Sequence, residues 1–96
     1  MKRFLLCFFI LVLSVLPVVC AAEDTSKMFQ DANTSYRTGD YAKAAELYEI
    51  LTGREPDVAS FHYNLANASV RVGKLSQAIL NYEKTLQLDP RNADAR

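Results

Sequence analysis

The sequence contains few of the residue types that build catalytic and metal sites. It has one histidine, His62, and two cysteines, Cys7 and Cys20, among its 96 residues. Nucleophilic catalysis with Ser/His or Cys/His pairs and zinc binding each need several such residues brought together. We therefore expect no enzyme activity, no metal and no cofactor, and we expect His62 to be a packed side chain.

Clustered glycine and an excess of positive charge are also missing. The three glycines are separated along the chain, which excludes a glycine-rich loop that cradles phosphate. Lys plus Arg and Asp plus Glu number 11 each, and a chain of 96 residues holds one small domain at most. Proteins that bind nucleic acid concentrate Lys and Arg on one face. This composition excludes a nucleic-acid partner.

Charged residues are absent from one long stretch near the N-terminus, residues 4–22. Two basic residues precede a thirteen-residue apolar run at 4–16, and small residues follow at 20–22. This order is typical of a secretory signal peptide. A thirteen-residue run covers only about 20 Å of a roughly 30 Å hydrocarbon layer. The sequence therefore predicts a signal peptide over residues 1–22, cleaved after Ala22, and export to the bacterial periplasm or cell envelope.

Two alternatives for this segment stay open. Nineteen consecutive uncharged residues are long enough to serve as an uncleaved membrane anchor. Cys20 is also a candidate for lipid attachment, although Val19 and Pro17 stand where a lipoprotein signal has a small and an aliphatic residue. A membrane contact is expected only if the segment is retained. After cleavage the chain has no cysteine and must be stabilised by packing alone.

Residues 25–58 and 59–92 are two copies of one pattern. Aligned without a gap, they share ten identical residues out of 34, where composition alone would supply about two or three. The identical pairs are Ser26/Ser60, Ala32/Ala66, Asn33/Asn67, Ser35/Ser69, Arg37/Arg71, Gly39/Gly73, Ala44/Ala78, Tyr48/Tyr82, Glu49/Glu83 and Pro56/Pro90. A repeat of this length predicts an all-α solenoid of two helix pairs. Residues 93–96 then begin a third helix pair or form a tail.

Each unit has the apolar spacing of two helices joined by a turn. In the second unit, apolar residues recur every three or four positions within 61–70 and 75–86, and Gly73 and Pro90 follow these stretches. The first unit repeats this pattern and ends near Gly53 and Pro56. Small residues let two helices approach closely, and tyrosines fill the space between hairpins. The residues expected to pack the repeats are Ala32, Ala44, Tyr48, Pro56, Ala66, Ala78, Tyr82 and Pro90.

Two motifs carry a family resemblance. They are G-D-Y-x-x-A-x-x-x-Y at 39–48 and N-L-A-N-A-x-x-x-x-G-K-L-x-x-A-I-x-x-Y-E-K-x-L-x-L-D-P at 64–90. Over residues 25–92 the chain resembles the tetratricopeptide repeat, a protein–protein interaction module. The first unit departs from the family at Met28 and Asp31, where an aromatic and an aliphatic residue are usual. Residues 63–96 are also loosely similar to the exported repeat proteins of bacterial aerotolerance operons.

The resemblance implies a concave groove that is lined by the first helix of each unit and binds a peptide segment of another protein. The matching positions are Phe29, Asn33, Tyr36, Arg37, Tyr63, Asn67, Val70 and Arg71. Two interpretations of Arg37 and Arg71 stay open, because an arginine at these positions either binds a ligand carboxylate or complements the negative end of its own helix.

Some relatives clamp a C-terminal carboxylate with two asparagines and several basic residues. Asn33 and Asn64 match the two asparagine positions, but Phe29 and Asp94 occupy basic ones. The resemblance therefore does not support that clamp here.

Two functions from different classes are compatible with this sequence. The first is a scaffold or adaptor that binds a protein partner in the groove. The second is self-association, because repeat units bury their apolar faces only against neighbours and about three units are usually needed. The face expected to lack a cover carries Leu75, Ile79, Tyr82, Leu86 and Leu88.

Overall fold

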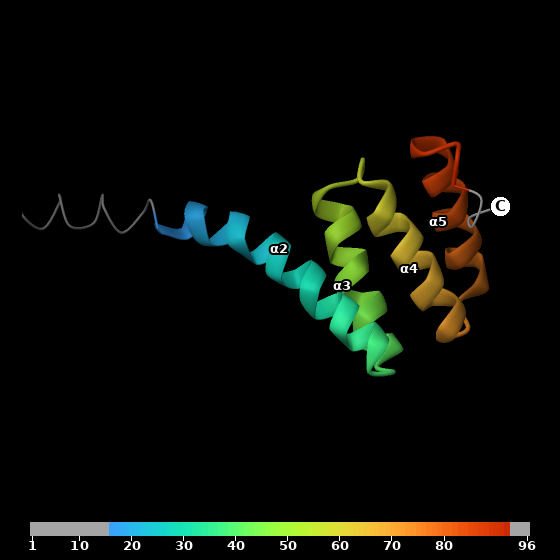
Figure 1. Cartoon of the computed structure of the whole chain (residues 1–96), viewed down its shortest axis with the longest axis horizontal. Coiled ribbons are helices and arrows are strands. Elements are labelled where there is room, and N and C mark those ends of the chain that lie inside the picture. The colour runs from blue at the N-terminus through green and yellow to red at the C-terminus, as the bar shows by residue number, and fades with distance from the viewer. Residues whose placement is uncertain (1–15, 93–96) are drawn as a thin grey trace, which may run out of the picture.

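A computed structural model describes residues 16–92, with side chains from residue 25 onward. It contains four helices, α2 (Leu16–Arg37), α3 (Tyr41–Arg54), α4 (Ala59–Arg71) and α5 (Leu75–Leu88), which form two hairpins (Figure 1). The expected all-α fold of two helix pairs is confirmed. The segments 1–15 and 93–96, which belong to the predicted signal peptide and to the predicted third pair or tail, lie outside the described residues.

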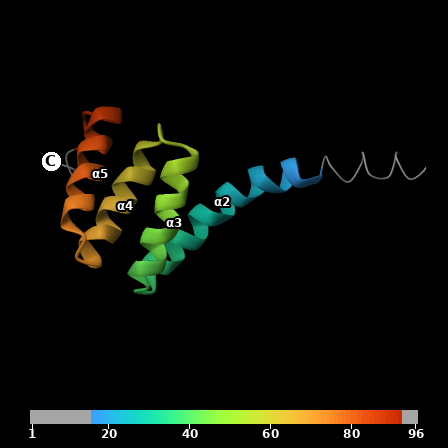
Figure 2. The same cartoon turned by 180° about the vertical axis from the view of Figure 1, so that it is seen from behind.

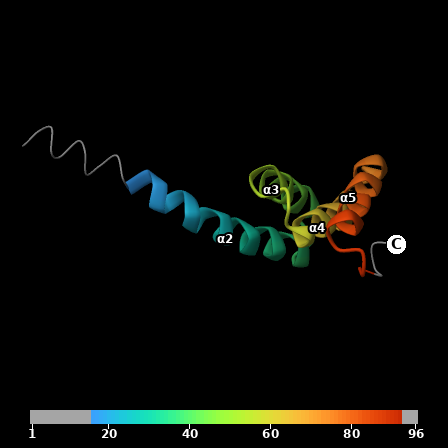
Figure 3. The same cartoon turned by 90° about the horizontal axis from the view of Figure 1, so that it is seen from above.

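The helices are arranged in two layers. Each helix packs on the next one along the chain, and α3, α4 and α5 lie side by side when seen from the front or from behind (Figures 1 and 2). Seen from above, the first helices α2 and α4 lie on one side of the molecule and the second helices α3 and α5 on the other (Figure 3). This order of layers brings equivalent positions of the two units close together across the hairpins.

Helix α2 is longer than the repeat pattern predicts. It begins at Leu16 and continues through the boundaries expected at residues 22 and 25, and its start projects away from the other helices (Figure 1). The reason is local: Pro17 sits in the first turn, where proline is tolerated, and no glycine or proline follows until Gly39. Cleavage after Ala22 stays a prediction. None of the helices among residues 16–92 is long and apolar enough to cross a membrane.

Glycine ends the first helix of each hairpin. Gly39 and Gly73 have φ values of 90° and 82°, in the left-handed region that a side chain disfavours. The amides of Asp40 and Lys74 donate to the carbonyls of Ser35 and Ser69, each at 2.8 Å, which satisfies carbonyls that the helix leaves open. These two turns reverse the chain in the same way.

Proline ends the second helix of each hairpin. Glu55 and Asp89, the residues before Pro56 and Pro90, have φ values of −133° and −137°, because proline excludes the helical conformation at the preceding residue. Gly53 lies inside the last turn of α3, so the helix end expected near it is set by Pro56. Both prolines are exposed and contribute to these ends, which corrects their assignment as packing residues.

The core runs through both hairpins. All four alanines expected at close helix contacts are buried: Ala32, Ala44 and Ala66 are 0% exposed and Ala78 is 2% exposed. A cluster of side chains joins the two hairpins, and its buried members are Ala32, Ala44, Ala45, Tyr48, Leu51, Phe61, Leu65 and Ala68. Burial of this cluster is the main stabilising contribution, since the described residues contain no cysteine from residue 21 onward.

His62 is a structural residue, as expected. Its side chain is 7% exposed, with Nε2 lying 2.8 Å from the Pro56 carbonyl and Nδ1 lying 3.0 Å from Asn81 Oδ1. The Asn81 amide nitrogen donates to the Gln77 carbonyl at 2.9 Å, which orients its oxygen toward the ring. The imidazole thus ties the loop between the hairpins to α4 and α5.

Candidate functional site

A cavity of about 270 Å³ opens between α2, α3 and α4. Its lining is polar and aromatic, and it consists of Asn33, Tyr36 and Arg37 from α2, Tyr48 from α3, and Asn64 and Asn67 from α4. The two first helices supply five of these six side chains, because the layered arrangement sets α2 beside α4. Four of the lining residues, Asn33, Tyr36, Arg37 and Asn67, were predicted from the sequence to line a groove.

A tyrosine holds each of the two repeated asparagines. The Tyr48 hydroxyl donates to Asn33 Oδ1 at 2.5 Å, and the Tyr82 hydroxyl donates to Asn67 Oδ1 at 2.5 Å. Because the amide oxygen accepts the phenolic proton, the amide Nδ2 of each asparagine is the group it offers as a donor to a ligand. The sequence shows Asn and Tyr at repeated positions, but the pairing depends on how α2 packs on α3 and α4 on α5.

The electrostatics of the cavity favour groups that accept hydrogen bonds. Burial raises the pKa of the Tyr48 hydroxyl, the nearby Tyr36 raises it further, and Arg37 opposes the shift, so Tyr48 stays a neutral donor. The Arg37 guanidinium donates to Thr34 Oγ1 at 3.3 Å and remains exposed. Among the described residues that line the cavity, none is acidic. A carbonyl or carboxylate oxygen is therefore the complementary ligand group.

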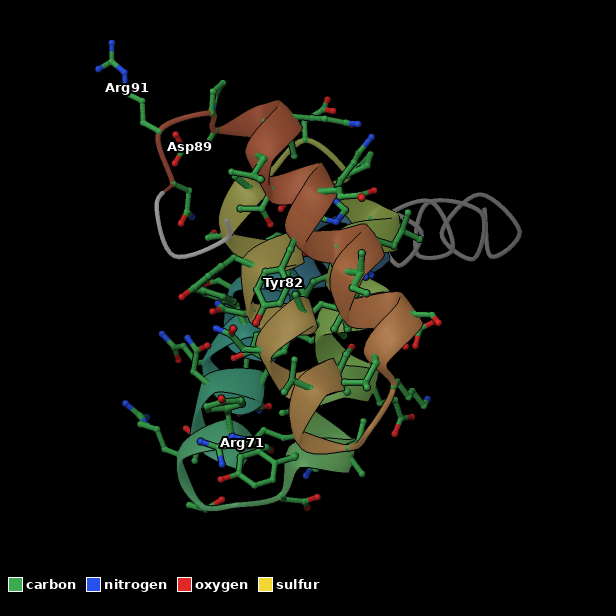
Figure 4. All side chains as sticks on the ribbon, turned by 90° about the vertical axis from the view of Figure 1, so that its right-hand side faces the viewer. Arg71, Tyr82, Asp89 and Arg91 are labelled. Carbon is green, nitrogen blue, oxygen red and sulfur yellow. The ribbon has the colours of Figure 1, made fainter. Side chains whose placement is uncertain are left out.

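Arg71 lies outside the cavity, in an aromatic cluster with Tyr36 and Tyr41. Its guanidinium carbon is 5.2 Å from the centroid of the Tyr41 ring, and the Tyr36 and Tyr41 rings meet edge to face at 5.1 Å. A hydrogen bond with Tyr36 raises the pKa of Arg71 above its ordinary value. Figure 4 shows Arg71 at the end of the molecule where α2 turns into α3. This arginine connects the second hairpin to the first.

Three further residues expected in the groove lie elsewhere. The Phe29 ring packs 5.1 Å from Phe61 and 6.4 Å from Tyr48, between centroids, so it belongs to the joint between hairpins. Tyr63 packs 6.1 Å from Tyr82. Val70 is 45% exposed and does not line the cavity. These residues lie three or four positions from Asn33 or Asn67 and share their side of the helix. They miss the cavity because they lie one turn further along the helix, where Phe29 and Tyr63 pack against other aromatic rings.

Two lining residues were absent from the expected groove. Tyr48 comes from a second helix and was expected only to pack between hairpins, yet it does both because its ring is buried while its hydroxyl reaches Asn33. Asn64 was visible in the sequence as the match to an asparagine of carboxylate-binding relatives. No group of three or more His, Cys, Asp or Glu side chains that could hold a metal ion occurs within the described part of the chain.

A family model described as the tetratricopeptide repeat matches residues 29–93. The chain belongs to the tetratricopeptide repeat (TPR) family. TPR units serve as protein–protein interaction modules, and the TPR module is what the comparison with family models detects in this chain.

The TPR relatives are long proteins that carry other domains. The chain is 43% identical over 48 residues to the serine/threonine-protein phosphatase T of Trypanosoma brucei brucei, a match covering 50% of this chain and 10% of the phosphatase. It is 29% identical over 72 residues to the TPR repeat-containing thioredoxin TTL4 of Arabidopsis thaliana, covering 75% of this chain and 11% of that protein. The chain thus spans about a tenth of the length of these relatives.

Proposed function

We propose that this TPR chain is a non-catalytic scaffold or adaptor of the bacterial cell envelope, which binds a peptide segment of another protein in the cavity between α2, α3 and α4. The observation that carries the proposal is the convergence of donors on one cavity. Asn33 and Asn67 are each held by a tyrosine, and Arg37 lies beside them. Preorganised donors lower the entropy lost when a peptide binds.

The cavity suits part of a peptide rather than a whole folded partner. Its volume of about 270 Å³ accommodates one side chain or one chain terminus. A backbone carbonyl or a carboxylate of the peptide accepts hydrogen bonds from the Arg37 guanidinium and from the side-chain amides of the lining asparagines, Asn33, Asn64 and Asn67. The half-buried Tyr36 ring provides a flat apolar wall for the rest of the bound segment.

Affinity capture from envelope extract tests the cavity. The informative variant is Arg37→Ala with Asn64→Ala, because both residues line the cavity and neither makes a hydrogen bond to a buried partner. We expect the captured partner, once identified, to bind this variant at least about tenfold more weakly, as for the loss of one charged and one neutral hydrogen bond.

Arg54→Ala is the matched control, because Arg54 is also an exposed arginine in the last turn of a helix but does not line the cavity. It should leave affinity unchanged. Equal binding of the partner to the wild type and to the double variant, with unchanged circular dichroism, would refute the cavity as the binding site.

Export is the part of the proposal that rests on residues 1–22. Their basic start, apolar run and small residues favour a secretory signal, and Ala22 is the favoured cleavage position. Expression of the full sequence in a bacterium, followed by intact-mass measurement, gives the N-terminus and any attached lipid together. A chain that begins at Glu23 in the periplasmic fraction supports export, and an unprocessed chain in the cytoplasmic fraction contradicts it.

A second candidate function is self-association or stacking through α5. Leu75, Ile79 and Leu80 are 62%, 60% and 66% exposed on this helix. Analytical sedimentation at tens of micromolar separates the candidates, since a dimer that Ile79→Glu disrupts favours self-association. A compact monomer argues against it.

A further inference from the structure

His62 is the only histidine of the sequence, and its buried ring lies between two oxygen atoms. Nε2 is 2.8 Å from the Pro56 carbonyl oxygen, and Nδ1 is 3.0 Å from Asn81 Oδ1. Both oxygens accept hydrogen bonds and neither donates one. A neutral imidazole carries one N–H group, whereas an imidazolium carries two. This arrangement therefore satisfies both ring nitrogens only when His62 is protonated.

A third oxygen fixes the orientation of the Asn81 amide. Its Nδ2 donates to the Gln77 carbonyl at 2.9 Å, one helical turn earlier in α5. Exchanging the two ends of the amide would set Oδ1 against that carbonyl, so that two acceptors face each other. Three oxygens in this network thus need three hydrogens. The amide supplies one, and only the charged ring supplies the other two.

The charged groups around the ring stand in solvent. Those near its partners along the chain are all exposed, namely Arg54, Glu55, Asp57, Glu83 and Lys84. Arg71, the other basic residue of α4, lies over Tyr41 at the opposite end of that helix. Tyr48 is the ionisable side chain that α3 buries, and its hydroxyl donates to Asn33. Because solvent screens exposed charges, the two neutral oxygens dominate the surroundings of the ring.

The first unit builds the same hairpin without this pair. Met28 and Leu47 occupy the positions equivalent to His62 and Asn81, and they line a hollow of about 250 Å³. Two apolar side chains cannot respond to pH. Histidine is the side chain whose charge ordinarily changes between pH 5 and 8. The second unit therefore has a pH-sensitive group at a position where the repeat itself does not require one.

We propose that His62 and Asn81 form a pH-sensitive switch where the loop between the hairpins meets α4 and α5. In the protonated state Nε2–H donates to the Pro56 carbonyl and Nδ1–H donates to Asn81 Oδ1. When Nδ1 releases its proton to water, it becomes an acceptor. The Asn81 side chain then turns to present Nδ2 to the ring, and its bond to the Gln77 carbonyl is given up.

The amide turns because its bond to Gln77 is the contact that costs least to lose. The Gln77 carbonyl keeps the backbone hydrogen bond that it accepts within α5. The Pro56 carbonyl instead has the ring as its partner, at the shorter of the two ring contacts. Release of Pro56 is the competing response, and the experiment distinguishes it.

Nuclear magnetic resonance of the full chain labelled with ¹⁵N tests the switch. The ring nitrogen signals of His62 report where its protons are, and the side-chain NH₂ signals of Asn81 report the turn. Between pH 5 and 8 we expect both sets to shift with one midpoint, with Nε2 remaining protonated at the higher pH. Asn33 and Asn67 are internal controls, because tyrosine hydroxyls hold their amides and do not titrate in this range.

Two variants sharpen the test. Asn81→Asp places a negative charge beside Nδ1, so the ring should keep its proton to a pH about one unit higher than in the wild type. Gln77→Ala is the matched control on the same helix, because only the backbone carbonyl of Gln77 takes part in the network. It should leave the titration of the ring and the turn of the amide unchanged.

Several results would overturn the proposal. Asn81 signals that stay constant while the ring titrates would show that the amide does not turn, and a ring that keeps one state from pH 5 to 8 would show that there is no switch. Shifts confined to the backbone around Pro56 would assign the response to the loop. An unchanged titration in Asn81→Asp would show that ring and amide do not meet in solution. The cavity proposal is tested separately, because no residue of this network lines the cavity.

Discussion

The two hairpins are nearly the same in sequence pattern, but equivalent residues behave differently because they have different neighbours. Tyr48 and Tyr82 each donate to an asparagine of their own hairpin, yet Tyr48 is 2% exposed and Tyr82 is half-buried. Arg71 lies over Tyr41 of the preceding hairpin, whereas Arg37 contacts Thr34 of its own helix. The repeat fixes the Tyr–Asn contact within each hairpin, and position in the stack fixes how deeply each tyrosine is buried and what each arginine contacts.

A second contrast lies in how the hairpins fill equivalent positions. The first unit has Met28 and Leu47 where the second has His62 and Asn81, so an apolar pair beside an open hollow corresponds to a buried hydrogen-bonded pair. Among the described residues no helix packs over this hollow, whereas the equivalent residues of the second unit, His62 and Asn81, are buried. The buried His62 and Asn81 side chains are stable in the second unit because each has a hydrogen-bonding partner.

The largest expected effect contrasts the two tyrosines. Tyr48→Ala should lower the free energy of unfolding by about 3–5 kcal/mol, since it opens a cavity in the core, while Tyr82→Ala should cost about 1–2 kcal/mol. Urea unfolding of residues 23–96 followed by circular dichroism measures both. Should Tyr48→Ala fail to fold, Tyr48→Phe isolates the hydroxyl and should cost about 1 kcal/mol. Equal losses for the two alanine variants would contradict the contrast.

The next largest effect tests whether the polar pair of the second unit can be replaced by the apolar pair of the first. His62→Met or Asn81→Leu alone should cost about 1–3 kcal/mol, because each leaves a buried polar partner unsatisfied. Both changes together restore the pair found in the first unit and should cost less than the sum of the single changes. Unfolding free energies of the four proteins give the coupling energy. An additive result would show that the His62–Asn81 contact contributes no specific stability.

A smaller effect on stability should distinguish Ser69 from Ser35, which occupies the equivalent position in the first unit. Ser69 is 0% exposed and its hydroxyl has no hydrogen-bond partner among the described residues, whereas Ser35 is 8% exposed at the equivalent position. Ser69→Ala should raise the free energy of unfolding by up to about 1 kcal/mol, because a buried hydroxyl without a partner is unfavourable. Ser35→Ala should change it by less than about 0.5 kcal/mol. A loss of stability in Ser69→Ala would show that its hydroxyl is satisfied in solution.

The smallest expected effect is a loss of folding stability at alkaline pH. Burial raises the pKa of Tyr48 above its ordinary value of 10.0, so the unfolded chain releases this proton first as the pH increases. The unfolded state then binds fewer protons than the folded state, and stability present below about pH 10 is lost above it. Tyr48→Phe should flatten this fall more than Tyr82→Phe, whose pKa burial also raises. Thermal midpoints from pH 8 to 11 measure it, and identical slopes would contradict the assignment.

Much of the fold could be predicted from the 34-residue period. Gly73 and Pro90 mark helix ends in the second unit, and the spacing of apolar residues gives α4 and α5 within one or two residues. The start of α2 could not be predicted, because residues 18–38 contain no glycine or proline to stop a helix. The exposed Leu80 was also missed, since it lies off the stripe that Leu75 and Ile79 share.

The candidate site could be predicted only in part from the sequence. Asn33 and Asn67 were found because they repeat, and they do lie near one another around one cavity. Phe29 and Arg71 were grouped with them by position in the repeat, but an aromatic ring is drawn into the core and a guanidinium onto an aromatic face when such partners are near. Those partners belong to other helices, so their nearness has no signature in the sequence.

By itself, the sequence determined local conformation: where helices end, which faces are apolar and that one hairpin is made twice. These properties depend on residues within a few positions of one another, through backbone sterics and helical spacing. Only the tertiary structure decided which asparagines a tyrosine holds, which arginine leaves the cavity and which apolar stripe stays uncovered. Such choices depend on contacts between helices far apart in the chain, where packing and desolvation of each side chain are set by whichever helix lies beside it.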